Sequence, residues 1–362
     1  MGEKKLMKGN EALAEGAVRA GCRFFAGYPI TPQNEVPEYM SWRLPEVGGA
    51  FIQAESEVSA INMIYGAAGT GTRCMTSSSS PGISLKQEGL SYCAGADLPL
   101  LIANMMRGGP GLGNIAGCQG DYWQATRGGG HGDYRLYVVA PNSVNELANL
   151  PRKCYEVAFK YRIPAMILAD GTIGQMMEPV EYKDEPIDVS KLEKPEWAIG
   201  INKEHRAKRR ITSYDLTEGG LEIMVNDRIK RYKAIEENEV MFEEKMTEDA
   251  DMVVVAFGTP SRVATAAIKM LREKGIKAGL FRPITLWPFP YKQIQQLAKR
   301  VKKFVAVESS MGQMVEDVRL ALNGTVETHL YCKVGAAVLT AEEVAAALEE
   351  IYNGSTKYAA VK

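Results

Sequence analysis

The sequence predicts two α/β domains, each built on a largely parallel β-sheet. Short, continuous apolar segments such as CRFFAG and PAMILAD alternate with helix-like segments, which is typical of strands that are covered on both faces. The alternation stops near Pro179 and resumes at Asp251 with DMVVVAFG. A length of 362 residues also suits two domains better than one.

In the first domain, a helix is expected from Glu11 to Ala20, with Asn10 as its N-cap and Gly21 just past its end. Further apolar segments with helical character occupy residues 58–69 and 144–161. The predicted strands lie at residues 22–27, 49–54, 73–78, 98–106, 135–140 and 164–170. Strands and helices that alternate in this way indicate a parallel sheet with helices on both faces.

From Pro179 to about Asp249 the chain is polar and rich in charge, which favours a linker and a solvated helix. Alternation then returns, with strands at 251–258, 276–283 and 301–309 and helices at 261–275, 315–324 and 341–354. We therefore expect a first domain over residues 1–185, a charged connector with a helix over 186–248, and a second domain over 249–362.

The bulk composition gives no reason to expect nucleic acid or a membrane as a partner. The 43 basic and 44 acidic residues leave a net charge of −1, and no run of about 18 apolar residues could span a bilayer. The charged N-terminus does not resemble a signal peptide. The six scattered cysteines form no C-x-x-C pair, and three dispersed histidines are too few for a metal site made of histidines alone. Reduced, mostly buried thiols in a cytoplasmic protein are expected.

Ligands of open parallel sheets bind beyond the carboxyl ends of the strands, so the turns that follow strands are the first candidates for a site. The first such turn is GYPITPQ, in which two prolines would hold the Thr31 hydroxyl in place; Thr31 as a helix N-cap is the alternative. The second carries Glu55 and Glu57 at the start of an apolar helix. They are either partners of the helix dipole or carboxyl groups able to share a proton with a heterocycle.

Three further turns carry weaker signals. The run Thr76–Gly82 offers hydroxyls at a helix N-terminus, although it could equally be a plain loop. Arg107 stands at a strand end beside GGPGLG, where it is either a surface residue or a binder of a carboxylate or phosphate. Within GGGHGDY, His131 is either a candidate general acid or base, or a structural residue held by hydrogen bonds. Together these turns predict a ligand-binding edge without naming the ligand.

Several of these stretches, in the same order, resemble the α subunit of 2-oxoacid:ferredoxin oxidoreductases. The resemblance rests on KGNEALAEGAVRAGC, GYPITPQNE, QAESEVSAINMIYGAA, SSSSPGISLKQEG, MRGGPGLGN and GGGHGDYRLYVVAP, and later on VVVAFGTPSRVA, GIKAGLFRPITLWPFP and VESSMGQM. It covers nearly the whole chain and is weakest across the connector. ESEV, SSSSPG and GGGHGDY are more similar to the 2-oxoisovalerate (branched-chain) branch than to the 2-oxoglutarate branch.

The resemblance implies a pyrimidine-type thiamine-diphosphate-binding domain followed by a transketolase C-terminal-like domain. It implies that Glu57 meets N1′ of the cofactor's aminopyrimidine, that Thr31 faces cofactor and substrate, and that Arg107 binds the 2-oxoacid carboxylate. Glu55 ranks below Glu57, because the second glutamate of ESEV matches the family's position. The cofactor-binding set that follows from the resemblance is Tyr28, Pro29, Ile30, Thr31, Glu57 and Ser79.

The implied reaction is the coenzyme-A-dependent oxidative decarboxylation of a 2-oxoacid to acyl-CoA and CO2, with electrons passed to ferredoxin. No Gly-Asp-Gly occurs here, although the family's diphosphate–magnesium motif begins with it. The resemblance therefore implies a β subunit that holds the diphosphate and Mg²⁺, a γ subunit, and a ferredoxin-like δ subunit that carries [4Fe-4S] clusters. No metal ligand is assigned to this chain, and the active site would lie between chains.

Three alternatives stay open at this point. Arg127 and Arg135 could supply the second cationic contact that 2-oxoglutarate needs, which keeps a 2-oxoglutarate enzyme as the alternative to a branched-chain one. A non-catalytic assembly subunit is disfavoured by the joint presence of Glu57, Thr31 and Arg107. A self-sufficient thiamine transferase is disfavoured by the missing Gly-Asp-Gly motif.

Overall fold

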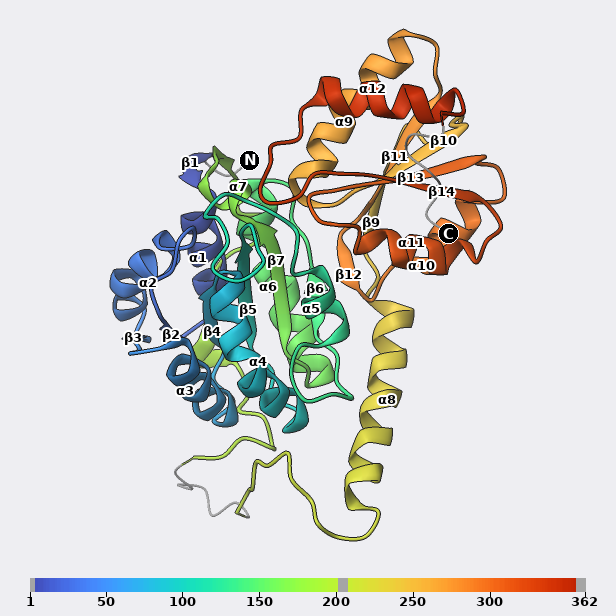
Figure 1. The fold of residues 1–362 in the computed structure, drawn as a ribbon. Coiled ribbons are helices and arrows are strands. Elements are labelled where there is room, and N and C mark those ends of the chain that lie inside the picture. The colour runs from blue at the N-terminus through green and yellow to red at the C-terminus, as the bar shows by residue number, and fades with distance from the viewer. Residues whose placement is uncertain (1–3, 201–207, 356–362) are drawn as a thin grey trace.

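The structure is a computed structural model and describes residues 4–200 and 208–355. It contains two main sheets (Figure 1). The first has seven strands in the order β12-β6-β7-β5-β4-β2-β3, and all of its pairs are parallel except β12 with β6. The second has five strands in the order β14-β13-β10-β11-β9, parallel except for the pair β11 and β9. The predicted α/β class is confirmed.

The elements of the first sheet alternate along the chain, as the sequence pattern predicts. They are α1 (Gly9–Arg19), β2 (Phe24–Gly27), α2 (Glu35–Glu46), β3 (Ala50–Gln53), α3 (Glu57–Gly69), β4 (Cys74–Ser78), α4 (Ser80–Gly95), β5 (Leu101–Met106), α5 (Tyr122–Arg127), β6 (Tyr137–Val139), α6 (Val144–Tyr161), β7 (Ala165–Asp170) and α7 (Gly171–Gln175). A small antiparallel pair, β1 (Lys5–Lys8) with β8 (Met177–Val180), lies beside them. Helix α1 packs against α2 and α6, and α3 packs against α4.

The remaining elements form the connector and the second sheet. They are the short helix η1 (Val189–Lys191), α8 (Gly220–Asn238), β9 (Phe242–Lys245), β10 (Met252–Val255), α9 (Gly258–Glu273), β11 (Ala278–Pro283), β12 (Thr285–Trp287), α10 (Tyr291–Leu297), β13 (Lys303–Glu308), α11 (Met314–Leu322), β14 (Glu327–Cys332) and α12 (Ala341–Tyr352). Helix α8, drawn in yellow, extends below the elements of the second sheet and along one side of the elements of the first sheet (Figure 1).

Asn10 is not the N-cap of the first helix, which corrects the sequence-based expectation. Helix α1 begins one residue before it, at Gly9, and Lys8 occupies the cap position. The Asn10 side chain is fully buried and donates to the carbonyl of Pro32 at 2.8 Å and to Glu35 Oε2 at 2.7 Å. A buried amide needs such partners, and these bonds tie α1 to the turn after β2. Gly21 follows the helix with φ = +94°, as its predicted position requires.

Two short strands join the halves of the chain. Strand β12 follows β11 along the chain, yet it pairs with β6 and forms the edge of the first sheet. Strand β9 lies within the predicted connector and pairs with β11 of the second sheet. One hydrophobic core includes residues of both sheets, among them Met166 of β7, Val253 of β10 and Trp287 of β12. The two sheets therefore pack into one continuous structure, and any cavity between them lies inside it.

Five of the six cysteine side chains are buried and Cys332 is half-buried, in agreement with the predicted buried thiols. Among the described residues, no helix is both long and apolar enough to cross a bilayer.

Candidate functional site

The turn that follows β2 is tied to neighbouring strands by its glutamine. Gln33 is fully buried, and its Nε2 donates to the carbonyl of Tyr28 at 3.3 Å. Its Oε1 accepts a short hydrogen bond from Ser77 on β4. Helix α2 begins only at Glu35, with Asn34 in the cap position, so the alternative in which Thr31 caps a helix is wrong. Gln33 fixes the shape of the turn, a role that the sequence pattern did not predict.

Thr31 stands exposed within this turn. Its Oγ1 accepts a hydrogen bond from Asn34 Nδ2 at 3.4 Å, and its carbonyl accepts one from Arg107 Nη1 at 2.9 Å. Tyr28 and Pro29 are also exposed, and Ile30 is half-buried. The turn thus presents its side chains outward, beyond the carboxyl end of β2, where a ligand of the sheet would bind.

Glu57 is the first residue of α3 and is 6% exposed. Ser56 caps the helix by accepting a hydrogen bond from the Ser59 backbone N–H at 3.1 Å, so the Glu57 carboxyl group is not used as the cap. Glu55, by contrast, is exposed and accepts a short hydrogen bond from the Ser59 hydroxyl, which lowers the pKa of Glu55. Of the two carboxyl groups in this turn, Glu57 is the one that lies inside the protein.

The start of α4 lies directly against Glu57. A Cβ added at Gly82 would lie 2.6 Å from Glu57 Oε1 and 2.1 Å from Ser78 Oγ, so this position has room for glycine alone. Ser79 occupies the N-cap position but its side chain does not cap the helix. The hydroxyls of Ser78 and Ser79 are buried and have no hydrogen-bond partner within the described part of the chain. Buried polar groups without partners are uncommon and indicate a ligand or water.

Arg107 follows β5 and is 7% exposed. Its backbone N–H donates to Ser80 Oγ at 3.0 Å, and its Nη2 donates to the carbonyl of Leu112 at 3.0 Å. The side chain thus forms two hydrogen bonds, to the carbonyls of Leu112 and Thr31, and these use two of its five N–H donors. Its Nε is buried without a partner among the described residues. The guanidinium is thus held in place by backbone carbonyls and retains donors for a ligand.

A cavity of about 400 Å³ lies next to these residues, between the two halves of the chain. Its first wall comes from the start of α4 and the glycine-rich loop after Arg107, and its second from the segments that follow β13 and β14. Its lining comprises Ser80, Pro81, Ser84, Gly109, Pro110, Gly111, Cys118, Gly120, Asp121, Ser310, Met311, Gln313, Val334 and Gly335. Within it, Asp121 Oδ2 accepts hydrogen bonds from Ser80 Oγ at 2.6 Å and from Asn104 Nδ2 at 2.9 Å, and burial raises the pKa of Asp121.

The glycine-rich segment GGGHGDY does not bring a histidine into the site. His131 is exposed, and its backbone carbonyl accepts a hydrogen bond from Ser91 Oγ at 2.6 Å. Arg127 forms an ion pair with Glu316 of α11 at 2.8 Å, and Arg135 Nη1 donates to the carbonyl of Thr126 at 2.9 Å. Arg127 and Arg135 are the candidate cationic contacts for the second carboxylate of 2-oxoglutarate. Both have partners within the chain.

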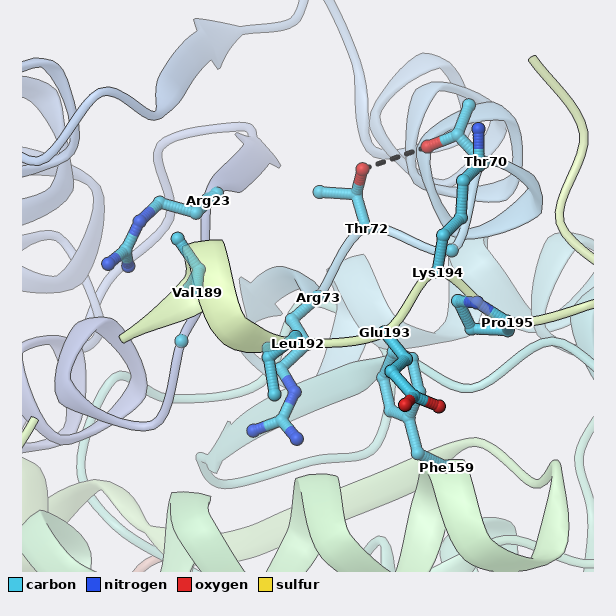
Figure 2. Close-up of a pocket in the computed structure, with 12 residues that line it drawn as sticks. Arg23, Thr70, Thr72, Arg73, Phe159, Val189, Leu192, Glu193, Lys194 and Pro195 are labelled. Carbon is cyan, nitrogen blue, oxygen red and sulfur yellow. Dashed lines mark hydrogen bonds between the residues drawn. The ribbon is translucent and has the colours of Figure 1, made fainter. Parts of the chain in front are cut away.

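A second cavity, of about 470 Å³, lies at the opposite end of the sheet (Figure 2). It is lined by residues that precede β2 and β4 and by the connector, including Arg23, Arg73 and Leu192. Arg73 lies over the ring of Phe159 and donates to the carbonyl of Ala20 at 2.7 Å. None of the residues predicted for the site lines this cavity.

The residues around Glu57 fit an aminopyrimidine ring. A carboxyl group and two buried hydroxyls, which have no partner in the part of the chain that the structure describes, match the hydrogen-bonding edges of a nitrogen heterocycle. The turns that carry Thr31, Glu57, Ser79 and Arg107 follow β2, β3, β4 and β5, which are neighbours in the sheet. Among the described residues, no group of three or more His, Cys, Asp or Glu side chains is placed to hold a metal ion.

Two family models match the chain. Residues 15–246 match the thiamine-diphosphate-binding domain of pyruvate flavodoxin/ferredoxin oxidoreductases, and residues 250–344 match core domain II of pyruvate:ferredoxin oxidoreductase. Ketoisovalerate oxidoreductase subunit VorB of Methanothermobacter thermautotrophicus is 46% identical over 97% of this chain and 99% of its own length. The 2-oxoglutarate synthase subunit KorA of the same organism is 36% identical over 95% of this chain and 98% of its own length.

The solved structures agree with these matches. A 2-oxoglutarate:ferredoxin oxidoreductase from Magnetococcus marinus, solved with 2-oxoglutarate, coenzyme A and succinyl-CoA, superposes with a TM-score of 0.87 at 25% identity. The alignment covers 96% of this chain and 65% of that longer chain. A split-gene transketolase superposes with a TM-score of 0.57 at 14% identity over 95% of this chain and 97% of its own, which shows a shared fold. The chain belongs to the 2-oxoacid:ferredoxin oxidoreductase family, of which it is an α-type subunit.

Proposed function

We propose that this chain supplies one half of a thiamine-diphosphate site that decarboxylates branched-chain 2-oxoacids, with 2-oxoisovalerate as the main substrate. The products are acyl-CoA and CO2, and the electrons pass to ferredoxin. The observation that carries the proposal is the position of Glu57, buried at the start of α3 near Ser78, whose buried hydroxyl has no partner among the described residues. Glu57 holds and transfers a proton at N1′ of the bound aminopyrimidine. The cofactor itself supplies the nucleophile and the electron sink.

The other residues of the turns orient the substrate. The Arg107 guanidinium, fixed by the carbonyls of Thr31 and Leu112, binds the 2-oxoacid carboxylate through its remaining donors. Thr31, in the outward-facing turn with Tyr28, Pro29 and Ile30, lies against the cofactor and the substrate. Ser79 contributes its unpaired hydroxyl to the cofactor. These contacts act by positioning the cofactor and the substrate.

The preference for a branched aliphatic substrate is supported by the relatives and by the ion pair of Arg127. The ketoisovalerate subunit VorB is more similar to this chain than the 2-oxoglutarate subunit KorA is. A 2-oxoglutarate enzyme needs a cation for the second carboxylate. Arg127 is already paired with Glu316, which offsets its charge. An apolar pocket for an aliphatic tail needs no such cation.

The rest of the active site is proposed to come from partner chains in the cytoplasm. A β subunit holds the diphosphate and Mg²⁺, a γ subunit completes the assembly, and a ferredoxin-like δ subunit carries the [4Fe-4S] clusters. The missing Gly-Asp-Gly motif and the absence of C-x-x-C pairs in the sequence support this division. We also propose that residues 1–185, 186–248 and 249–362 act as the cofactor domain, the connector and the second domain.

The substrate assignment is tested on the complex purified without oxygen. Coenzyme-A-dependent dye reduction is measured in parallel with 2-oxoisovalerate, 2-oxoglutarate and pyruvate. We expect kcat/KM to be at least about tenfold higher for 2-oxoisovalerate, because one buried unpaired charge in an apolar pocket costs more than about 1.4 kcal/mol. A preference for 2-oxoglutarate would overturn the substrate assignment. Inactivity with all three, in a complex that contains cofactor and clusters, would favour the non-catalytic assembly subunit.

A further inference from the structure

Lys86 of α4 is a fully buried lysine that the proposed chemistry does not use. Its side chain is 0% exposed. Its Nζ donates to Thr76 Oγ1, on β4, at 2.8 Å. An ammonium group has three donors, and a single hydroxyl is a poor replacement for its lost hydration. A buried lysine in this setting therefore depends on a nearby negative charge.

The packing of α4 places Lys86 beside Glu57. Gly82, Lys86 and Gly89 are spaced by four and three residues, so they share one face of α4. A Cβ at Gly82 would lie 2.6 Å from Glu57 Oε1, and a Cβ at Gly89 would lie 2.5 Å from Ile61 Cγ2. Both contacts are to α3. Lys86 thus lies between two points at which α4 touches α3, on the face that meets Glu57.

The charges of the two groups act on each other. Burial lowers the pKa of Lys86 to about 7, and the negative charge of Glu57 acts in the opposite direction. From α3 the charged group that acts on the amine is Glu57, and from β4 the facing polar atom is the uncharged Thr76 Oγ1. The ammonium group and the carboxylate therefore attract each other inside the protein.

We propose that Lys86 is a positioning residue whose ammonium charge makes the Glu57 carboxyl group a better proton donor to the bound cofactor. This inference rests on the function proposed for Glu57. The proton moves from the Glu57 carboxyl oxygen to N1′, while Lys86 keeps its own proton. The positive charge stabilises the carboxylate that remains and opposes the uptake of a further proton by the site.

The test is Lys86→Met in the assembled complex, because methionine has a similar length and no charge. We expect kcat at about pH 6, where the wild-type amine is largely charged, to fall about tenfold. The alkaline limb of the kcat profile, where the carboxyl donor loses its proton, should move up by about one pH unit, since one pKa unit corresponds to a factor of ten. The KM for the 2-oxoacid should stay within about twofold of wild type, because Lys86 does not touch the substrate. An unchanged alkaline limb would overturn the inference.

A second readout does not depend on turnover. Calorimetric titration of the cofactor-free complex with thiamine diphosphate, in two buffers of different ionisation enthalpy, gives the number of protons taken up on binding. At pH 7 this number should differ between wild type and Lys86→Met, because the charge acts on the group that exchanges the proton. Equal proton numbers in the two proteins would contradict the inference.

Controls separate charge from packing and this inference from the proposed function. Thr76→Ser keeps the hydroxyl that the amine bonds and alters packing alone, so it should lower Tm and keep the wild-type alkaline limb. The same shift as in Lys86→Met would overturn the inference. If Lys86→Met does not assemble, Lys86→Gln is measured in the same way.

Turnover by Glu57→Gln would defeat the proposed function itself. An inactive Glu57→Gln with an unshifted Lys86→Met would defeat the Lys86 inference alone.

Discussion

Gly82 is the residue that allows α4 to start directly against Glu57. A Cβ at this position would lie 2.6 Å from Glu57 Oε1, which is closer than real Cβ atoms approach their neighbours, and Ser78 Oγ would be closer still. Glycine at this position therefore sets the distance between α4 and the carboxyl group. Any larger residue at this position would require the Ser78 and Glu57 side chains to move away from α4.

We predict opposite effects for two glycine-to-alanine changes in neighbouring helices. Gly82→Ala should lower stability by about 1–3 kcal/mol, because the Ser78 hydroxyl, the Glu57 carboxyl group or α4 itself must move to relieve the overlap. Gly66→Ala, in the exposed middle of α3 where nothing lies within 4 Å, should raise stability by about 0.5–1 kcal/mol. Chemical denaturation of both variants checks this. Equal effects would show that the close contact at Gly82 does not determine the packing.

The site residues differ in how far the sequence could predict them. Thr31, Glu57 and Arg107 follow strands whose apolar character is visible in the sequence, and the structure places all three at one edge of the sheet. Lys86 was missed because a lysine is expected on a solvated face, and its burial depends on the packing of α4 against α3. The glycines four residues before it and three after it were the signal that could have found it.

At the scale of the elements, α8 is held to the first sheet's domain through its arginines. Most of α8 is exposed, as predicted for a solvated helix, but Arg228 is 4% exposed. Its Nε donates to Asp97 Oδ1 at 2.9 Å, and Arg231 Nη2 donates to the same oxygen at 2.8 Å. Arg228 also donates a short hydrogen bond to the carbonyl of Gly95 at the end of α4. The helix is thus anchored by charge more than by apolar burial.

Replacing Arg228 by methionine should loosen α8 specifically. The variant loses the bonds to Asp97 and Gly95, and we expect a cost of about 2 kcal/mol, since hydrogen bonds to charged groups contribute about 1.5–3 kcal/mol. Hydrogen exchange measured by mass spectrometry should become faster in α8 and stay unchanged in α6. Lys230→Met, at an exposed position of the same helix, is the control. Unchanged protection of α8 in Arg228→Met would contradict this anchoring.

The sequence predicted the long elements better than the short ones. Strands such as β7 and β10 are continuous apolar runs that need no knowledge of their neighbours. Strands β9 and β12 have only four and three residues. Each becomes a strand because a distant partner, β11 or β6, offers it an edge. Such pairing is a property of the tertiary structure, and a local pattern does not predict it.

At the scale of the whole molecule, Arg282 links the two halves. It is 3% exposed, and its Nη2 and Nη1 bind the Glu146 carboxylate of α6 at 2.7 and 2.9 Å. Its Nε donates to Glu243 Oε2 of β9 at 2.8 Å. Tyr122 of α5 adds a second link by donating to Asp317 Oδ2 of α11 at 2.7 Å. Together with β12, these contacts join the two predicted domains into one body. The sequence ranges of the domains do not by themselves indicate this connection.

This link makes stability depend on pH in the acid range. Burial raises the pKa of Glu243, but the charge and hydrogen bond of Arg282 outweigh it and leave the pKa below its ordinary value of 4.5. The stabilisation is therefore complete above about pH 4.5 and is lost as the pH falls through the lower, folded-state pKa. The difference in Tm between wild type and Arg282→Met should be constant from about pH 7 to 5 and should shrink below about 4.5. Calorimetry that finds the same difference at about pH 3.5 and 7 would contradict this.

The proposed role of this chain depends most on Glu57, the carboxyl group that moves a proton at the shared active site. The most direct measurement compares Glu57→Gln with Glu55→Gln in the assembled complex, by coenzyme-A-dependent dye reduction and by Tm. We predict that Glu57→Gln loses at least about 100-fold in kcat with normal assembly, as expected for loss of a general acid. Glu55→Gln, at an exposed position two residues earlier, should keep wild-type activity. Near-normal kcat in Glu57→Gln would contradict the proposed role.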